Sequence, residues 1–456
     1  MEAFFKLRER GSTVRAEVTG GVTTFITMAY IMVVNPAILS FAGIPAGPGT
    51  VATIVTAVFG CVLMGLIANR PIAVAPYMGE NAFIAFGLTA LGIGWEQRLG
   101  AVFVSGALFL VITLVGIRGR LANSVPVGLK HSFAAGIGLF LAFIGLHETG
   151  IVTSFVTGMP AQALPTGAGG LFTAPAVPVK IGNLRDPQVL LAVAGFVLMT
   201  VLMIRKIRGA LLIGILATAL TGGVLGFGHA PKSITALPFT GAYDLSAIAF
   251  KLDLAGVLQL SFLPVLLTLF LMSFLDTLGT LTGLGSAANL LDEKGNFPQV
   301  ERPMLVDALT CMFSGVVGTS TSGAYIESAT GISEGARTGL AALVTAALFA
   351  VSLFFIPLIE PLQQLRFAYG PALIAVGVLM FGSVRRIDFD DLTEWIPAFV
   401  TIVMMLFTYN IANGLTAGLV VHPVLKIAAG RARELNAGTV ILALMCAAYY
   451  VFGLPH

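Results

Sequence analysis

Pro71-Ile-Ala-Val-Ala-Pro76-Tyr77-Met-Gly79-Glu80-Asn81-Ala82-Phe83 interrupts an apolar stretch with an extended piece and then a new helix start. The second half of the chain does the same at Gly318-Thr-Ser-Thr-Ser-Gly323-Ala-Tyr325-Ile-Glu327-Ser328-Ala329. Each break sets an acid at the start of the new helix. At membrane depth, free backbone N–H and C=O groups are tolerated only within protein or beside a cavity. Two interrupted segments at corresponding places in two halves therefore predict the solute site of a transporter.

Composition places the chain in a membrane. Apolar residues make up 57% of its 456 residues and charged residues only 10%, whereas a soluble domain carries about a quarter charged residues. Lipid must therefore be the solvent for much of the chain. The net charge of +3 gives no indication of nucleic-acid binding, and the three cysteines lack the spacing of metal ligands or of a disulfide framework. The sequence has no Walker, nucleophile-elbow or zinc-protease motif, so we expect neither an enzyme nor a cofactor.

The apolar runs predict fourteen membrane spans. Most runs approach the ~20 residues that a spanning helix needs. Seven spans per half would make the second half enter the membrane from the opposite side, which predicts an inverted repeat. A last run, 436–453, is left open as an interfacial helix or a further span. Besides the two interrupted segments, the runs lie near 17–39, 50–69, 98–118, 126–147, 187–204, 209–227, 257–284, 303–317, 337–358, 368–384, 395–410 and 411–428.

Basic residues give the orientation. They gather with the N-terminus on one side of the predicted spans, which is the cytoplasmic side under the positive-inside rule. Loops 40–49 and 148–186 then lie outside. The acidic cluster at 388–394 is interpreted as a solvated cytoplasmic loop. The basic residues on the cytoplasmic side include Arg70, Arg118, Arg120, Lys130, Arg205, Lys206, Arg208, Arg385 and Arg386.

Three acids fall within the predicted spans. Asp276 has roughly a dozen uncharged residues on either side, and an ionised group at the bilayer centre costs about 2.5–3.5 kcal/mol even on the lenient insertion scale. Glu327 begins a half-helix, where free N–H groups favour an anion. Glu80 is left open as a solute ligand or a helix cap. Asp276 could instead bond to the hydroxyl of Thr277 or Thr280, and the hydroxyls of 319–322 could serve the extended backbone alone.

Four motifs, taken in order, resemble the adenine/guanine/hypoxanthine permeases, a branch of the nucleobase–cation symporters related to the nucleobase–ascorbate transporters. The resemblance runs over nearly the whole chain. One position departs from the family pattern, which commonly reads Gly-Met-Gly-Leu-Asn where this chain has Glu80 before Asn81. The motifs are Thr24-Phe-Ile-Thr-Met-Ala-Tyr-Ile-Met-Val-Val-Asn35-Pro36, Gly79-Glu-Asn-Ala-Phe-Ile-Ala85, Phe274-Leu-Asp276-Thr-Leu-Gly-Thr280 and Tyr325-Ile-Glu327-Ser-Ala-Thr-Gly331.

The resemblance implies the uracil-permease fold, an all-α polytopic membrane protein of fourteen spans in a 7+7 inverted repeat. Spans 3 and 10 would contain short antiparallel strands. Spans 1–4 and 8–11 would form a core subdomain, and spans 5–7 and 12–14 a gate subdomain. In this chain the core would comprise 1–118 and 255–360, and the gate 119–254 and 361–456.

The resemblance also implies a function, namely secondary active transport of adenine, guanine or hypoxanthine by movement of the core against the gate. Asp276 corresponds to the substrate-binding acid of span eight, Glu327 to its partner in span ten and Asn81 to a polar residue of span three. A purine is flat and edged with donors and acceptors, so Phe83 or Tyr325 could cover its ring face. Ser328, beside Glu327, is a further candidate substrate ligand.

Proton coupling is the expected energy source, because carboxylates in apolar surroundings, here Asp276, Glu327 and Glu80, can bind a proton along with the solute. The expected partners are a purine, a proton and membrane lipid, with a homodimer through the gate left open. The expected location is the plasma membrane (the inner membrane of a bacterium). The alternatives are a xanthine or uracil permease, or an anion exchanger or channel on the same fold. An anion site should present positive charge at the breaks, where this chain has Glu80 and Glu327.

Overall fold

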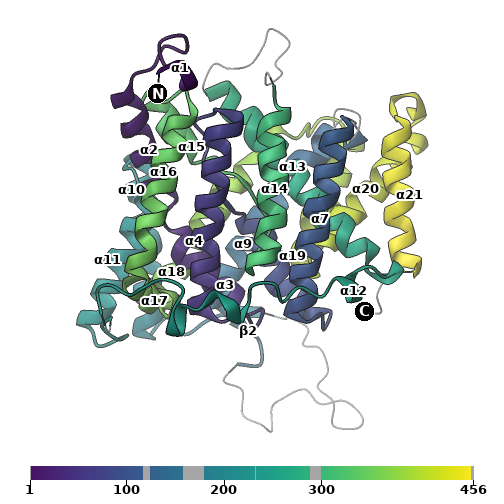
Figure 1. Ribbon diagram of the computed structural model, residues 1–456. Helices are drawn as coiled ribbons and strands as arrows, with labels where there is room; N and C mark the ends of the chain where they lie inside the picture. The colour runs from purple at the N-terminus through teal and green to yellow at the C-terminus, as the bar shows by residue number, and fades with distance from the viewer. Residues whose placement is uncertain (1, 117–123, 158–178, 232, 288–298, 453–456) are drawn as a thin grey trace.

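The protein is a bundle of long helices in this computed structural model, which describes residues 2–116, 124–157, 179–231, 233–287 and 299–452. Figure 1 shows the helices side by side between two edges, one carrying the N-terminus and α1 (Glu2–Phe5) and the other carrying β2 (Val152–Ser154). We call the second of these the β2 edge. Among the described residues, nine helical stretches are long and apolar enough to cross a membrane.

The predicted spans correspond to helices of the structure. The five spans outside those nine stretches are α11, α14, α19 and the two interrupted segments. The spanning helices are α2 (Val14–Met28) with α3 (Ile31–Ser40), α4 (Ala46–Leu63), α7 (Trp95–Val115), α9 (Val127–Glu148), α10 (Pro187–Ile204), α11 (Ala210–Val224), α13 (Leu263–Ala287), α14 (Glu301–Val317), α16 (Gly339–Ser352) with α17 (Ile356–Gln364), α18 (Arg366–Phe381), α19 (Leu392–Phe407) and α20 (Ile411–Ala428).

The two interrupted segments meet in an antiparallel pair of strands. Strand β1 (Val74–Pro76) pairs with β4 (Ser322–Ala324), with Ala75 opposite Gly323. The ladder extends by one bond at each end, because Tyr77 N donates to Thr321 O and Tyr325 N donates to Ala73 O, both at 2.9 Å. Pairing satisfies backbone groups that would otherwise be unpaired inside the protein. The predicted strands of spans 3 and 10 are therefore confirmed, and each provides the hydrogen-bond partners for the backbone of the other.

A half-helix follows each strand. Strand β1 leads into α5 (Met78–Ala82), which continues as the five-residue π-turn η2 (Phe83–Gly87) and the short α6 (Leu88–Ala90). Strand β4 leads into α15 (Ser328–Ser333). A π-turn inserts an extra residue into a helix and is frequent at functional sites.

Packing repeats between the two halves. Helix α7 lies along α14, and α4 lies along α16, while α4 contacts β1 as α14 contacts β4. Glycine permits the close approach in both pairs: a Cβ on Gly106 would lie 2.7 Å from Met312 N, and one on Gly339 would lie 2.2 Å from Gly65 O. These paired contacts, together with the paired strands, fit the predicted 7+7 inverted repeat.

A second group of helices packs beside the first. Helix α9 lies against α18 and α19, α18 also contacts α10 and α11, and α19 contacts α20. The last helix, α21 (Ala437–Phe452), packs on α20, and in Figure 1 its axis lies roughly along those of the neighbouring spans. Its orientation favours a further span for 436–453 over an interfacial helix. The boundary expected between 118 and 119 lies outside the described residues.

One small feature was not predicted. Strand β2 pairs antiparallel with β3 (Val179–Ile181) at the start and end of the long loop after α9. The Gly- and Pro-rich sequence between them indicates only a loop, and the loop's central part lies outside the described residues.

Candidate functional site

Asp276 lies in the middle of α13 (Leu263–Ala287), and its side chain is half-buried. Its carboxylate interacts electrostatically with those of Glu327 and Glu80. No described residue donates a hydrogen bond to it. The alternative bond from Thr277 is not made, because the Thr277 hydroxyl donates to Asp307 Oδ2 at 3.0 Å. Asp276 is thus an acid at membrane depth whose carboxylate oxygens can still accept hydrogen bonds from a solute.

Glu327 lies at the other side of the site, at the start of α15. Its side chain makes no capping hydrogen bond to the helix. Instead Glu327 Oε1 accepts a hydrogen bond from the Tyr30 hydroxyl at 2.8 Å. Tyr30 belongs to the junction between α2 and α3, so span 1 holds the acid of span 10 in place.

Glu80 is the most enclosed of the three acids. Its side chain is 0% exposed, and no described residue donates a hydrogen bond to either carboxylate oxygen. These contacts do not support a role for Glu80 as a cap of α5. Burying a charge without a partner costs several kcal/mol, so the carboxyl needs a proton, a ligand or a rearrangement to be tolerated there.

Asn81 is held by a polar cluster around Asn35, a residue whose role the sequence does not indicate. Asn81 Nδ2 donates to Asn35 Oδ1 at 2.5 Å, and Asn35 Nδ2 donates to Thr53 and Thr319 at 2.8 and 3.0 Å. Ser320 donates to the same Asn35 oxygen at 3.3 Å. Two hydroxyls of the 319–322 run therefore join span 10 to Asn35 of span 1 rather than serving their own backbone.

The predicted aromatic residues occupy different positions. Phe83 is fully buried, with its ring against the backbone of Gly87. Tyr325 lies parallel to Tyr77, with ring centroids 6.4 Å apart and planes at 8°. The Tyr325 hydroxyl donates to Pro76 O, and Ser328 Oγ accepts from Ala73 N at 2.9 Å. Tyr325 and Ser328 thus brace the strand pair from both ends.

Asp307 is a buried acid that sequence reasoning missed. Its Oδ2 accepts from Ala324 N at 3.0 Å as well as from Thr277, and Thr277 bonds to the Tyr77 hydroxyl at 2.9 Å. The chain of bonds connects β4, α14, α13 and the residue after β1. Asp307 follows Glu301 and Arg302 by only a few residues, so its position resembles that of an acid at the membrane surface.

Comparison with known proteins identifies the family. A model of the permease family matches residues 15–416, which is most of the chain. The chain belongs to this permease family. Proteins of this kind are transporters and not enzymes, and the family together with the apolar helices makes the permease a multi-pass membrane protein.

Curated relatives cover nearly the whole permease. It is 38% identical over 453 residues to the adenine permease AdeP of Escherichia coli (strain K12), covering 99% of this chain and 96% of that one. It is 36% identical over 444 residues to the guanine/hypoxanthine permease PbuO of Bacillus subtilis (strain 168), covering 97% and 98%. The similarity to adenine and guanine/hypoxanthine permeases that the motifs predicted is thereby confirmed.

Solved structures share the fold. The transmembrane domain of the cyanobacterium bicarbonate transporter BicA matches with a TM-score of 0.63 at 17% identity, covering 89% of the permease and 97% of that chain. SLC26A9 matches with a TM-score of 0.59 at 14% identity, covering 91% and 66%. Identities this low establish the fold alone, and they confirm the predicted fold class.

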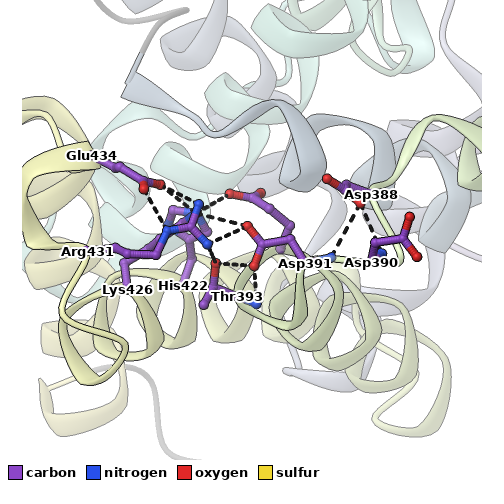
Figure 2. Close-up of polar contacts among 9 residues, drawn as sticks. Asp388, Asp390, Asp391, Thr393, His422, Lys426, Arg431 and Glu434 are labelled. Atoms are coloured by element: carbon purple, nitrogen blue, oxygen red, sulfur yellow. Dashed lines mark hydrogen bonds and ion pairs between the residues drawn. The ribbon is translucent and has the colours of Figure 1, made fainter.

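A second cluster of charges lies where α19 begins and α20 ends (Figure 2). The Lys426 ammonium lies 2.9 Å from Glu394 and Glu434 and 3.6 Å from Asp391, with its side chain only 4% exposed. Arg431 pairs with Asp391 and Glu434, each at 2.6 Å. The interpretation of 388–394 as a solvated loop is therefore wrong for Asp391 and Glu394, since both are paired with bases of the next helix and loop.

The pairing sets the protonation of this second cluster. Hydrogen bonds from Arg431 and then Lys426 lower the pKa of Glu434 to about 2. Bonds from Thr393 and Arg431 hold the pKa of Asp391 well below its usual range. A cavity of about 380 Å³ adjoins the cluster and is also lined by His422, whose Nε2 lies 3.3 Å from Glu394. Each acid of the cluster has a basic partner, unlike the three acids of the candidate site.

Proposed function

We propose that this permease moves purine nucleobases (adenine, guanine or hypoxanthine) across the plasma membrane by secondary active transport. One observation carries the proposal: Asp276, Glu327 and Glu80 interact around the paired strands at membrane depth, and none has a basic partner among the described residues. Charges in such places are costly and usually functional. The names of the relatives AdeP and PbuO support a purine as the solute.

The acids suit the edge of a purine. Asp276 and Glu327 can each accept N–H hydrogen bonds from the ring, while the side-chain oxygen of Asn81 has no hydrogen-bond donor among the described residues. A site that pairs a solute's polar edge rejects analogues that lack it, because buried partners would be left unmatched. Proton binding by one of the carboxylates would complete the site and couple uptake to the proton gradient.

Movement of a core against a gate would provide alternating access. The helices before residue 118 and those of 255–360 contact one another, as do α9, α10, α11, α18, α19 and α20. We assign these groups to core and gate, with the cytoplasmic N-terminus that the positive-inside rule favours. Exposed apolar side chains on the gate, such as Leu190, Val197 and Leu220, would face lipid or a second copy of the chain.

Anion exchange is the rival on this fold. An anion site should present basic side chains at the breaks, whereas the charged residues there are Glu80 and Glu327. A xanthine or uracil permease differs only in which edge of the base is recognised.

Uptake of radiolabelled adenine, guanine, hypoxanthine, xanthine, uracil and bicarbonate, in cells lacking their own permeases, separates these functions. We expect at least one of the first three to accumulate and a protonophore to abolish the accumulation. Uptake of bicarbonate without any nucleobase would overturn the proposal.

A further inference from the structure

An aromatic cluster joins the two helix groups near the β2 edge. Phe86 belongs to η2, on the same interrupted segment as Glu80 and six residues further along. Its ring lies 5.9 Å from the ring of Tyr409, which connects α19 to α20. Tyr409 also contacts Phe140 and Phe143 of α9, with centroids 5.2 and 6.1 Å away. Because α9 ends at Glu148, just before β2, these contacts lie toward the β2 edge of the bundle.

Tyr409 occupies a backbone position that usually belongs to glycine. Its φ is +52°, and the bond from Asn410 N to Met405 O closes the end of α19 as a Schellman turn. Glycine is the usual residue at this left-handed position, and a residue with a Cβ adopts it only at an energetic cost. Unlike glycine, tyrosine at this position contributes the three ring contacts with Phe86, Phe140 and Phe143.

The other side of the contact is irregular as well. Phe86 lies within the π-turn η2 rather than in a regular helix. Phe41, at the end of α3, extends the cluster with its ring 5.3 Å from Phe86 and the Arg366 guanidinium 5.5 Å from its own centroid. Arg366 begins α18 and is paired with Glu148 at 3.4 Å. A second contact between the groups, Phe41 with Arg366, thus accompanies the first.

We propose that Phe86 and Tyr409 form a seal between the moving core and the gate, closing the solute path on the β2 side and separating when the path opens there. The inference rests on the proposed transport function. Because Phe86 lies less than two helical turns after Glu80 on the same segment, it would move together with Glu80. Movement of the solute site would therefore also move the Phe86 side of the seal. Both backbones of the contact are irregular, which suits a contact that forms and breaks in each cycle.

A reversible cross-link tests the seal. The three native cysteines are all buried, so a short bifunctional methanethiosulfonate should react with introduced pairs. In proteoliposomes, cross-linked Phe86→Cys/Tyr409→Cys should lose purine uptake by about tenfold or more, since one conformation is trapped, and reductant should restore it. The control pair Phe143→Cys/Tyr409→Cys lies within the gate, and its cross-linked form should transport as its reduced form does.

Uptake that survives cross-linking of Phe86→Cys/Tyr409→Cys would overturn the seal, as would failure of this pair to cross-link while the control pair does. If the unmodified permease takes up no purine, the proposed function fails instead.

A second variant separates sealing from folding: Tyr409→Gly relieves the backbone strain but removes the ring. It should keep its melting temperature near that of the native chain and show a several-fold lower KM for purine applied on the β2 side, whereas Tyr409→Phe should match the native chain in both. An unchanged KM for Tyr409→Gly would also count against the seal.

Discussion

The two acidic regions of the permease differ in their partners. Around the paired strands, Asp276 interacts electrostatically with Glu327 and with Glu80, and the Tyr30 hydroxyl donates a hydrogen bond to Glu327. Where α19 begins and α20 ends, Asp391 and Glu434 share Lys426 and Arg431. Paired charges hold elements together, while unpaired charges at depth persist only where they act on something else. The partner of each acid, rather than its position in the sequence, therefore separates the acids of the candidate site from those that hold helices together.

Neutralising Asp276 should have the largest effect on transport. Asp276→Asn should abolish purine accumulation while the protein still reaches the membrane, since a hydrogen bond to a charged group is worth about 1.5–3 kcal/mol and the coupling charge is lost as well. Uptake per expressed protein is the measurement. Asp390→Asn, an exposed acid of the other region, is the control. Undiminished uptake by Asp276→Asn would remove Asp276 from the site.

Glu327→Gln removes the charge of Glu327 but keeps the shape of the side chain and one acceptor oxygen. KM for the purine should rise by roughly tenfold, the loss expected for one charge-assisted bond, with little change in melting temperature. Tyr30→Phe should raise KM by less, since it removes only the 2.8 Å bond that holds Glu327 in place. If the melting temperature collapses and affinity is normal, Glu327 is structural.

Lys426→Met should produce the opposite pattern. It leaves Asp391, Glu394 and Glu434 close together without their shared base, so the melting temperature in detergent should fall by several degrees. Purine KM should stay unchanged. Arg433→Met, an exposed base of the same loop, should leave the melting temperature as it is. A raised KM at an unchanged melting temperature would place this cluster in the transport path.

Glu80 should show the smallest effect on rate. Glu80→Leu introduces the residue of the family pattern, so purine transport should survive with a changed substrate ranking or pH profile. Glu80→Gln separates loss of the charge from change of shape. An identical ranking and pH curve in both variants would mean that Glu80 takes no part in solute or proton binding.

The sequence predicts the parts of the site that interrupt a pattern. Asp276 stands out because its span is otherwise uncharged, and the breaks at 74–76 and 322–324 stand out against helical runs. It does not predict partners that only tertiary structure supplies. Asp307 is hidden by its nearness to Glu301 and Arg302, and the bases that pair with Asp391 lie on the next helix and loop. Nor does the sequence alone reveal that Asn35 forms hydrogen bonds with residues of three other spans.

Imposed ion gradients show whether the unpaired carboxylates of the candidate site couple solute transport to proton movement. Proteoliposomes containing the permease, with an imposed gradient of one ion at a time, should accumulate radiolabelled purine when protons flow inward, without sodium. Asp276→Asn should not accumulate it under the same gradient. Accumulation that follows an inward sodium gradient at equal pH, and ignores a pH gradient without sodium, would rule out proton coupling and point to the hydroxyl run at 319–322 as an ion site.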